Sequence, residues 1–356
     1  VNEEWISDKT RFACDGLRRR RLDKPWIRRA GTLEEADWPQ ALAAIAAKAK
    51  GTPADRVAAI AGDLACAESM FALKSLLAAL GSPHLDCRQD GAALDPACRA
   101  GYLFNTTIAG IERADACLLI GPDPRREAPL VNARLRKRWL LGGFSVGVIG
   151  EAANLTYRYE HLGFGPAELK AVAAGKHPFA QTLSTAKTPM LVLGQGALAR
   201  PDGGAILALA RQIADSCGLI KPDWNGFNVL HTAAARTGGL DLGFVPGPKG
   251  RDVAGIVAGA GEGAIQLLFL LGADEIDTTR LGSAFVVYIG HHGDRGAARA
   301  DVVLPSAAYT EKDATYVNTE GRVQRARRAV FPPGEAREDW RIVRALAESM
   351  GVRLDF

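Results

Sequence analysis

The sequence lacks the paired cysteines that zinc and iron–sulphur sites require. Its six cysteines are scattered and form no Cys-x-x-Cys pair: Cys14, Cys66, Cys87, Cys98, Cys117 and Cys217. No Cys/His group in the sequence therefore has the spacing of a zinc or iron–sulphur site. Scattered cysteines in a chain of 356 residues suggest reduced thiols in a cytoplasm-type compartment.

Long apolar segments are also missing. The longest strongly apolar run, 265–271, is far shorter than the ~20 residues that a membrane-spanning helix needs, so we expect no direct membrane span. No secretory signal opens the chain, and its first residue is Val1 rather than methionine. We therefore expect the chain to be an excised fragment of a longer protein.

A strong charge of one sign is absent as well. Lys and Arg number 44 against 40 Asp and Glu, and this small excess does not indicate a nucleic-acid partner. The local exception is the run from Arg18 to Arg21, followed by Lys24, Arg28 and Arg29. Such a run is commonly a solvated surface, and the alternative is a docking surface for an acidic partner.

Short, wholly apolar strands alternate with helices along most of the chain. We expect strands at 57–61, 116–120, 144–149, 190–193, 265–271, 285–289 and 302–304, and helices from Asp37 and at 68–80, 130–140 and 205–217. Strands of this kind are typical of parallel sheets that are buried on both faces. The pattern predicts an α/β protein with two open, mostly parallel-sheet (Rossmann-like) domains.

The predicted organisation has four consecutive parts. Residues 1–36 are polar and basic without clear periodicity, and we expect an extended arm. A first α/β domain should cover 37–180 and a second 181–330, because Gly, Lys, His, Pro, Ser and Thr accumulate near 175–188. Residues 331–356 should form a truncated C-terminal segment.

Two local patterns carry a possible chemistry. Residues 194–199 match the dinucleotide-binding fingerprint after a strand, but 201–204 delay the helix that should follow, which favours a simple tight turn. His291 and His292 are adjacent and have no third ligand nearby in sequence, so we expect polar loop or core histidines rather than a metal site.

Longer strings resemble a known superfamily. The segment 301–324 combines a strand that ends in Leu-Pro, Glu311, and an Asn-x-Glu-Gly-Arg-x-Gln stretch at 318–324. This segment, extended by 332–340, resembles the molybdopterin oxidoreductase superfamily. The strings at 1–12, 105–110, 127–134 and 290–294 are similar to one branch of it, the large iron–sulphur subunits of NADH:quinone oxidoreductase (respiratory complex I).

The resemblance implies a fold of molybdopterin oxidoreductase type and a place in an enzyme that transfers electrons from NADH to quinone. The iron–sulphur clusters of that subunit, 2Fe-2S and 4Fe-4S, would lie in a missing N-terminal part. Other peripheral-arm subunits would be the partners. The location would be the cytoplasmic side of the inner membrane, or the matrix side in a mitochondrion. This chain itself would be a non-catalytic scaffold without activity of its own.

Two other functions remain open. Catalytically active members of the superfamily hold molybdenum through a Cys, selenocysteine or Ser in a loop that here contains Cys87 and Cys98, and a thiolate suits a soft metal. The runner-up is thus a molybdopterin-dependent oxidoreductase of formate dehydrogenase type, and the third hypothesis is a nucleotide-binding module using 194–199. The complex I branch lacks the molybdenum cofactor, so we assign no catalytic, cofactor-binding or metal-binding residue to this chain.

Overall fold

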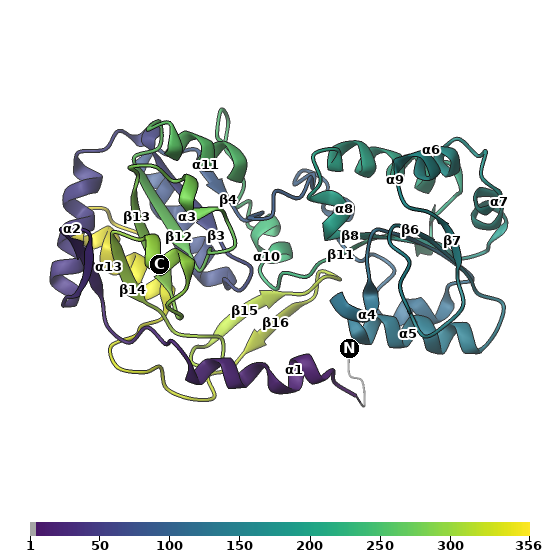
Figure 1. The fold of residues 1–356 in the computed structure, drawn as a ribbon, viewed down its shortest axis with the longest axis horizontal. Helices are drawn as coiled ribbons and strands as arrows, with labels where there is room; N and C mark the ends of the chain where they lie inside the picture. The colour runs from purple at the N-terminus through teal and green to yellow at the C-terminus, as the bar shows by residue number, and fades with distance from the viewer. Residues whose placement is uncertain (1–4) are drawn as a thin grey trace. The chain divides into compact units, whose positions relative to one another are not determined.

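The computed structural model describes residues 5–356, which form two compact units (Figure 1). The five-strand unit comprises 5–12, 92–232 and 319–322. The seven-strand unit comprises 13–91, 233–318 and 323–356. Each unit has its own mostly or wholly parallel sheet with helices on both faces, which confirms the predicted fold class.

The seven-strand unit is built on a sheet in the order β2-β1-β14-β13-β12-β3-β4. Its parallel strands are β3 (Val57–Ala61), β4 (His84–Asp86), β12 (Leu267–Leu271), β13 (Phe285–Gly290) and β14 (Val302–Pro305). The antiparallel strands β1 (Trp26–Arg29) and β2 (Thr32–Glu35) extend the edge beyond β14. A separate hairpin of β15 (Ala314–Val317) and β16 (Val323–Ala326) completes the strands of this unit.

Helices cover both faces of the seven-stranded sheet. On one side lie α2 (Trp38–Lys50), α3 (Ala67–Leu80) and α13 (Asp339–Ser349), and α13 packs on both α2 and α3 (Figure 1). On the other side α11 (Val253–Gly261) packs against the alternate strand residues Ile60, Leu268 and Leu270. The shorter helices of this unit are α10 (Arg236–Asp241) and α12 (Arg295–Arg299).

Helix boundaries follow the capping residues that the sequence displays. Asp37 accepts a hydrogen bond from the Gln40 backbone N–H at 2.7 Å, and the Gln40 side chain accepts one from the Asp37 N–H, so α2 begins with a capping box. Gly81 ends α3 with φ of 79°, a left-handed conformation that costs glycine little. Both predicted boundaries are confirmed.

The five-strand unit has a wholly parallel sheet in the order β11-β8-β5-β6-β7. The strands are β5 (Ala116–Ile120), β6 (Ser145–Ile149), β7 (Glu160–Gly163), β8 (Pro189–Gly194) and β11 (Phe227–Leu230). On one face lie α4 (Pro124–Glu127) and α5 (Pro129–Leu140); on the other lie α6 (Pro166–Ala173), α7 (Pro178–Thr185) and α9 (Gly203–Ser216) (Figure 1). The short elements α1 (Asp8–Phe12), α8 (Gln195–Leu198), β9 (Ile220–Lys221) and β10 (Trp224–Asn225) complete the unit.

The two units do not follow the predicted consecutive segments. β3 belongs to the predicted first domain, yet it pairs in parallel with β12 from the predicted second domain, residue Val57 opposite Leu267. Most of the five-strand unit is inserted between these strands in sequence. Parallel pairing needs only a crossover of sufficient length, so apolar runs alone do not reveal which strands share a sheet.

The predicted extended arm at 1–36 is wrong for its described residues. Residues 8–12 form α1, 13–18 form a 3₁₀ helix, and β1 pairs with β14 through Trp26 opposite Val303. Residues 1–4 lie outside the described part of the chain. The C-terminal segment contains α13, whose Ile342, Val343 and Leu346 are buried.

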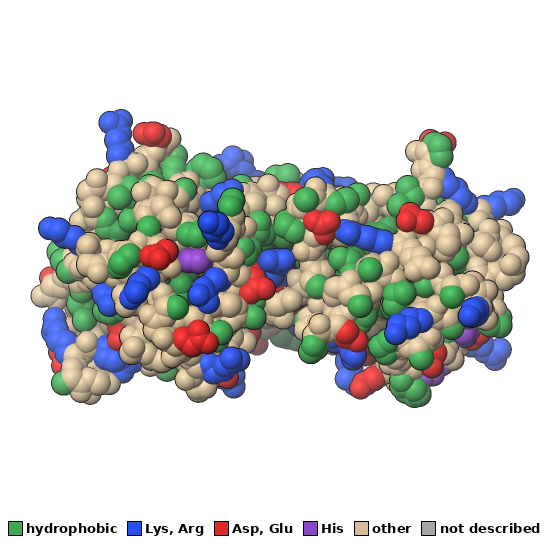
Figure 2. All heavy atoms as spheres, turned by 90° about the horizontal axis from the view of Figure 1, so that it is seen from above, with side chains coloured by type: hydrophobic (Ala, Val, Ile, Leu, Met, Phe, Trp, Pro, Cys, Tyr) green, Lys and Arg blue, Asp and Glu red, His purple; other side chains and the backbone are tan. Residues whose placement is uncertain are grey.

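The surface carries mixed charge. Figure 2 shows basic and acidic side chains interspersed with apolar ones over one face, in keeping with the formal net charge of +4. Among residues 5–356, no helix has the length and apolar character that crossing a membrane requires.

Candidate functional site

Polar side chains gather at the carboxyl ends of the parallel strands in the seven-strand unit. Asp63 follows β3, Asp86 ends β4, Glu275 follows β12 and His291 follows β13. This edge is where open α/β sheets bind ligands. It depends on a close backbone approach, because a Cβ at Gly62 would lie 1.9 Å from the Gly272 carbonyl oxygen.

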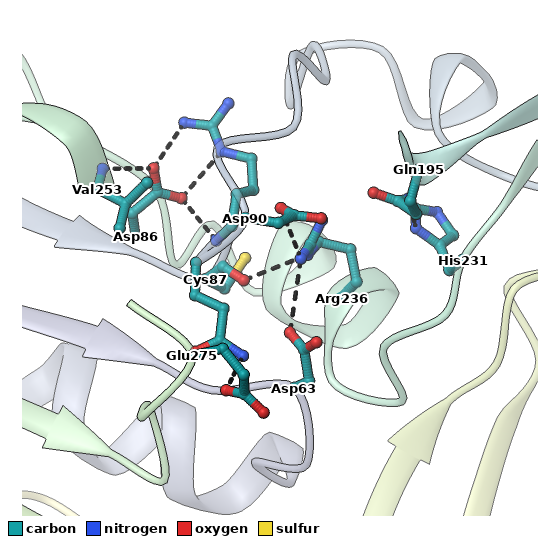
Figure 3. Close-up of polar contacts among 11 residues, drawn as sticks. Asp63, Asp86, Cys87, Asp90, Gln195, His231, Arg236, Val253 and Glu275 are labelled. Atoms are coloured by element: carbon teal, nitrogen blue, oxygen red, sulfur yellow. Dashed lines mark hydrogen bonds and ion pairs between the residues drawn. The ribbon is translucent and has the colours of Figure 1, made fainter. Parts of the chain in front are cut away.

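Arg236, the first residue of α10, lies at the centre of this edge and is 1% exposed. Its Nη2 lies 3.0 Å from Asp90 Oδ1 and 3.6 Å from Asp63 Oδ1 (Figure 3). Its Nε donates to the Cys87 carbonyl oxygen at 3.2 Å. One buried guanidinium is thus held by two carboxylates and a backbone oxygen, an arrangement that offsets the cost of burying its charge.

A second ion pair fixes the loop that carries Cys87 and Asp90. Asp86 is 1% exposed and accepts from the Arg88 Nε at 2.9 Å and Nη2 at 3.0 Å. It also accepts from the Val253 N–H at the start of α11, at 3.2 Å (Figure 3). The loop after β4 is therefore tied to its own strand and to the next helix.

Acidic groups dominate the rest of the edge. Gln89 donates to Glu275 at 2.5 Å. Burial raises the pKa of Asp63, and burial together with Glu275 raises the pKa of Asp274 to about 6. These carboxylates make the edge unfavourable for a polyanion, because the buried cation at its centre, Arg236, is already paired with Asp63 and Asp90.

The two cysteines that the sequence offered as soft-metal ligands do not come together in one unit. Cys87 belongs to the seven-strand unit and Cys98 to the five-strand unit. Cys87 is 1% exposed, and burial raises the pKa of its thiol to about 12, so it stays protonated and a poor ligand. Cys98 is exposed. Within residues 5–356 no group of three or more His, Cys, Asp or Glu side chains is placed to hold a metal ion.

The histidine pair after β13 is a local structural feature. His291 and His292 share a hydrogen bond between their Nδ1 atoms at 2.5 Å, and His292 Nε2 lies 2.9 Å from the Gly16 carbonyl oxygen. Burial and the neighbouring His292 lower the pKa of His291 to about 4, so its ring is neutral at pH 7.

In the basic stretch from Arg18 to Arg21, the first three side chains are exposed and the fourth is largely buried. Arg18, Arg19 and Arg20 are exposed, but the Arg21 side chain is 11% exposed and forms a bidentate pair with Glu311, at 2.5 and 2.6 Å. Arg21 Nε also donates to the His291 carbonyl oxygen at 3.0 Å. The expectation that all four arginines face water or a partner is wrong for Arg21, because β1 brings this segment beside residues 291–311.

The neighbouring motif residue Lys312 is also an internal partner. It is 5% exposed, and its ammonium contacts the carboxylate of Asp339 at the start of α13. Asp339 in turn accepts from the Ser69 hydroxyl at 3.1 Å, and Ser69 contacts the Cys66 thiol. Glu311 and Lys312, which carry part of the superfamily resemblance, therefore act in packing within this chain.

In the five-strand unit, the fingerprint 194–199 forms a tight turn and a short helix. A Cβ at Gly194 would lie 2.7 Å from the Pro122 nitrogen, so glycine is required by backbone packing there. Gln195 Nε2 donates to His231 Nδ1 at 2.7 Å, because His231 Nε2 must donate to the Tyr102 carbonyl oxygen at 2.5 Å (Figure 3). The side chain after Gly194 thus helps to orient the His231 ring.

Sequence reasoning missed Arg236, Asp63 and Asp90 as a group. Asp63 lies after β3, Asp90 lies after β4, and Arg236 begins α10. They come together only because β3 pairs with β4 and α10 lies beside both loops. The available signal was the placement of Asp63 just beyond the apolar strand 57–61, because the carboxyl end of a parallel strand lies at the ligand edge of the sheet. The arginine carried no such signal.

The family assignment rests on a match over most of the chain. The family model described as molybdopterin oxidoreductase matches residues 21–349, and the chain belongs to this family. A second model, described as "NADH-ubiquinone oxidoreductase NDSU1/NuoG-like, 4Fe-4S domain", matches residues 1–15.

Curated relatives point to one branch of the family. A subunit of the NADH-quinone oxidoreductase of Rickettsia felis is 47% identical over 352 residues, which are 99% of this chain and 51% of that protein. The mitochondrial NADH dehydrogenase [ubiquinone] iron-sulfur protein 1 of Solanum tuberosum is 45% identical over 358 residues, 100% of this chain and 47% of that protein. The chain spans about half the length of these relatives. The resemblance to large iron–sulphur subunits is confirmed.

Solved structures agree on the fold. Acetylene hydratase from Pelobacter acetylenicus superposes with a TM-score of 0.69 over 98% of this chain and 64% of that one, at 14% identity. A chain of the formyltransferase/hydrolase complex of Methylorubrum extorquens superposes with a TM-score of 0.66 over 92% of this chain and 98% of that one, at 20% identity.

The family's cofactor, a pterin that carries phosphate groups, does not fit the residues at the candidate site. A phosphate group at this edge would lie among the carboxylates of Asp63, Asp90 and Glu275, and Arg236, the buried cation there, is already paired with Asp63 and Asp90. The Cys87 thiol is protonated and buried. The edge therefore retains the geometry of a ligand site without the charges that such a ligand needs.

Proposed function

We propose that this chain is the molybdopterin-derived part of the large iron–sulphur subunit of an NADH–quinone oxidoreductase. The observation that carries the proposal is 47% identity to a subunit of such an enzyme across 99% of the chain. The test is purification of the complete tagged subunit from its own cells. Co-purification of NADH:quinone oxidoreductase activity is expected, and its absence from a folded, abundant subunit would contradict the proposal.

Within that enzyme the chain acts as a scaffold rather than a redox centre. The paired Arg236, the protonated Cys87 and the acidic strand ends support this role, because together they oppose binding of a phosphate-bearing cofactor. The runner-up function, a molybdopterin-dependent oxidoreductase, would need the opposite charge at this edge.

The cofactors, partners and location that we propose follow from the similarity to the large iron–sulphur subunit. The subunit carries iron–sulphur clusters, which the match of residues 1–15 to a 4Fe-4S domain model supports. Within residues 5–356 no group of three or more His, Cys, Asp or Glu side chains is arranged to hold one. The partners are other peripheral-arm subunits. The position is the cytoplasmic side of the inner membrane, or the matrix side in a mitochondrion.

The purified chain is expected to be colourless and to contain no stoichiometric molybdenum, tungsten or iron. The reason is that no described group of side chains is placed to hold a metal ion. Elemental analysis after anaerobic purification, beside a visible absorption spectrum, measures this. One metal atom per chain, or a charge-transfer band, would contradict the scaffold role while leaving membership of the enzyme intact.

A further inference from the structure

An exposed surface that is both basic and apolar follows the outer strand of the β15–β16 hairpin. Residues 323–331, called the β16 surface below, contain Arg325, Arg327 and Arg328 but no Asp or Glu. Its apolar members are also exposed: Val323 is 67%, Val330 54% and Phe331 78% exposed. Arginine and aromatic side chains together are typical of protein interfaces, whereas a purely solvated face would lack the apolar part.

The positive charge of this surface is not neutralised by the chain itself. Among residues 5–356, none of Arg325, Arg327 and Arg328 has an ion-pair partner, whereas nearby Arg322 pairs with Glu320 at 3.3 Å and Arg341 with Glu338 at 3.1 Å. Unpaired arginines on an exposed surface attract carboxylates.

The carboxylates around the surface are already used. A hollow of about 510 Å³ beside Arg325 is lined by Glu68, Asp313 and Glu338. Glu68 accepts from the Thr315 N–H at 2.9 Å, and Asp313 from the Arg328 N–H at 3.1 Å. Glu338 accepts hydrogen bonds from the side chains of Trp340 and Arg341 in α13. These three acids are therefore bound to other groups and do not neutralise the arginines of the β16 surface.

The backbone of β16 has an open edge. Within the described residues β16 pairs with β15 alone, from Val317 opposite Val323 to Ala314 opposite Ala326. In a two-stranded sheet half of the outer strand's N–H and C=O groups point away from its partner and can pair with another strand.

The loop after β16 is tied by its backbone to Thr310. The N–H groups of Ala329 and Val330 both donate to the Thr310 carbonyl oxygen, at 2.8 and 3.1 Å. The Arg328 guanidinium lies 4.3 Å from the ring centre of Phe331. An ordered surface loses little conformational entropy on binding, which favours docking.

We propose that the β16 surface is a docking site for an acidic, extended segment of another subunit. The segment adds a strand to the open edge of β16, sets its carboxylates against Arg325, Arg327 and Arg328, and covers Phe331. This inference rests on the proposed function, which supplies the multi-subunit enzyme. A protein strand fits better than a nucleic acid because the surface offers an unpaired strand edge and exposed apolar side chains.

The test is charge reversal in the complete subunit, expressed in its own cells. The variant Arg325→Glu/Arg327→Glu/Arg328→Glu is compared with the control Arg56→Glu/Arg158→Glu/Arg280→Glu, which reverses three exposed arginines that likewise lack an ion-pair partner among the described residues. Native-gel quantification should give about tenfold less assembled enzyme for the first variant and a near-normal amount for the control. Unreduced assembly of the first variant, or a loss confined to the control, would overturn the proposal.

A second measurement identifies the occupant and guards against misfolding. A photo-crosslinking amino acid at Val323 in the assembled enzyme should link to an acidic segment of another subunit, detected by mass spectrometry. The variant Arg325→Lys/Arg327→Lys/Arg328→Lys should retain both assembly and the cross-link. Cross-links only to lipid, nucleic acid or this subunit itself would overturn the docking proposal. If instead the wild-type subunit carries no NADH:quinone oxidoreductase activity, the proposed function fails and the cross-link still tests the docking.

Discussion

Replacing Asp339 with alanine is expected to lower the free energy of unfolding by about 3–5 kcal/mol. Asp339 and Lys312 are each 5% exposed and in direct contact, so the alanine variant leaves a buried ammonium without its carboxylate. It also removes the acceptor of the Ser69 hydroxyl. Denaturant unfolding of the purified chain measures the change.

The control for Asp339 is removal of both charges. The double variant Lys312→Met/Asp339→Leu should recover most of the lost stability, because apolar side chains of similar size tolerate burial. A double variant as unstable as the sum of the two single variants would contradict the ion-pair explanation. It would show that packing, rather than charge, determines the loss.

The Lys312–Asp339 pair also makes the stability of the folded chain depend on pH. Burial alone would raise the pKa of Asp339, but the Lys312 ammonium together with hydrogen bonds from Ser306 and Ser69 outweighs burial and holds this pKa below its usual value. A depressed pKa gives stability that is present above the unfolded-state value of about 4 and is lost as the pH falls through the folded-state value. For Lys312, burial alone would lower the pKa, but Asp339, with smaller contributions from Cys66 and Tyr316, outweighs burial and raises the pKa. That contribution is present below the unfolded-state pKa of about 10 and is lost at higher pH.

The variant Arg21→Ala should also destabilise the chain by about 3–5 kcal/mol, because it leaves the Glu311 carboxylate buried and unpaired. The Glu311 side chain is 4% exposed and receives both guanidinium bonds. Arg19→Ala, two residues earlier on the exposed run, should leave the melting temperature unchanged. Equal effects of the two substitutions in thermal unfolding would contradict the division of the basic run at Arg21.

Local structure was predictable where one segment contains its own signal. The apolar runs 57–61 and 116–120 coincide with β3 and β5, because a strand buried on both faces needs apolar side chains throughout. Asp37 and Gly81 marked helix ends because capping is chemistry between neighbouring residues.

What the sequence did not reveal depends on contacts between distant segments. β1 pairs with β14, so Trp26 lies opposite Val303, and nothing within residues 1–36 encodes that partner. The Arg21–Glu311 pair follows from the same contact. At the candidate site, Asp63, Asp90 and Arg236 come from three separate segments, and their charged groups meet only after the sheet has formed.

The central claim is that this chain supports the enzyme without taking part in its redox chemistry. The most direct measurement is the NADH:quinone oxidoreductase activity per assembled complex when the subunit carries Cys87→Ala and Cys98→Ala. Alanine is the sharper choice because a serine hydroxyl could still act as a metal ligand. The account predicts unchanged activity per complex, since Cys87 is a buried, protonated thiol and Cys98 belongs to no described metal-binding group. A large loss of activity at normal assembly would contradict it.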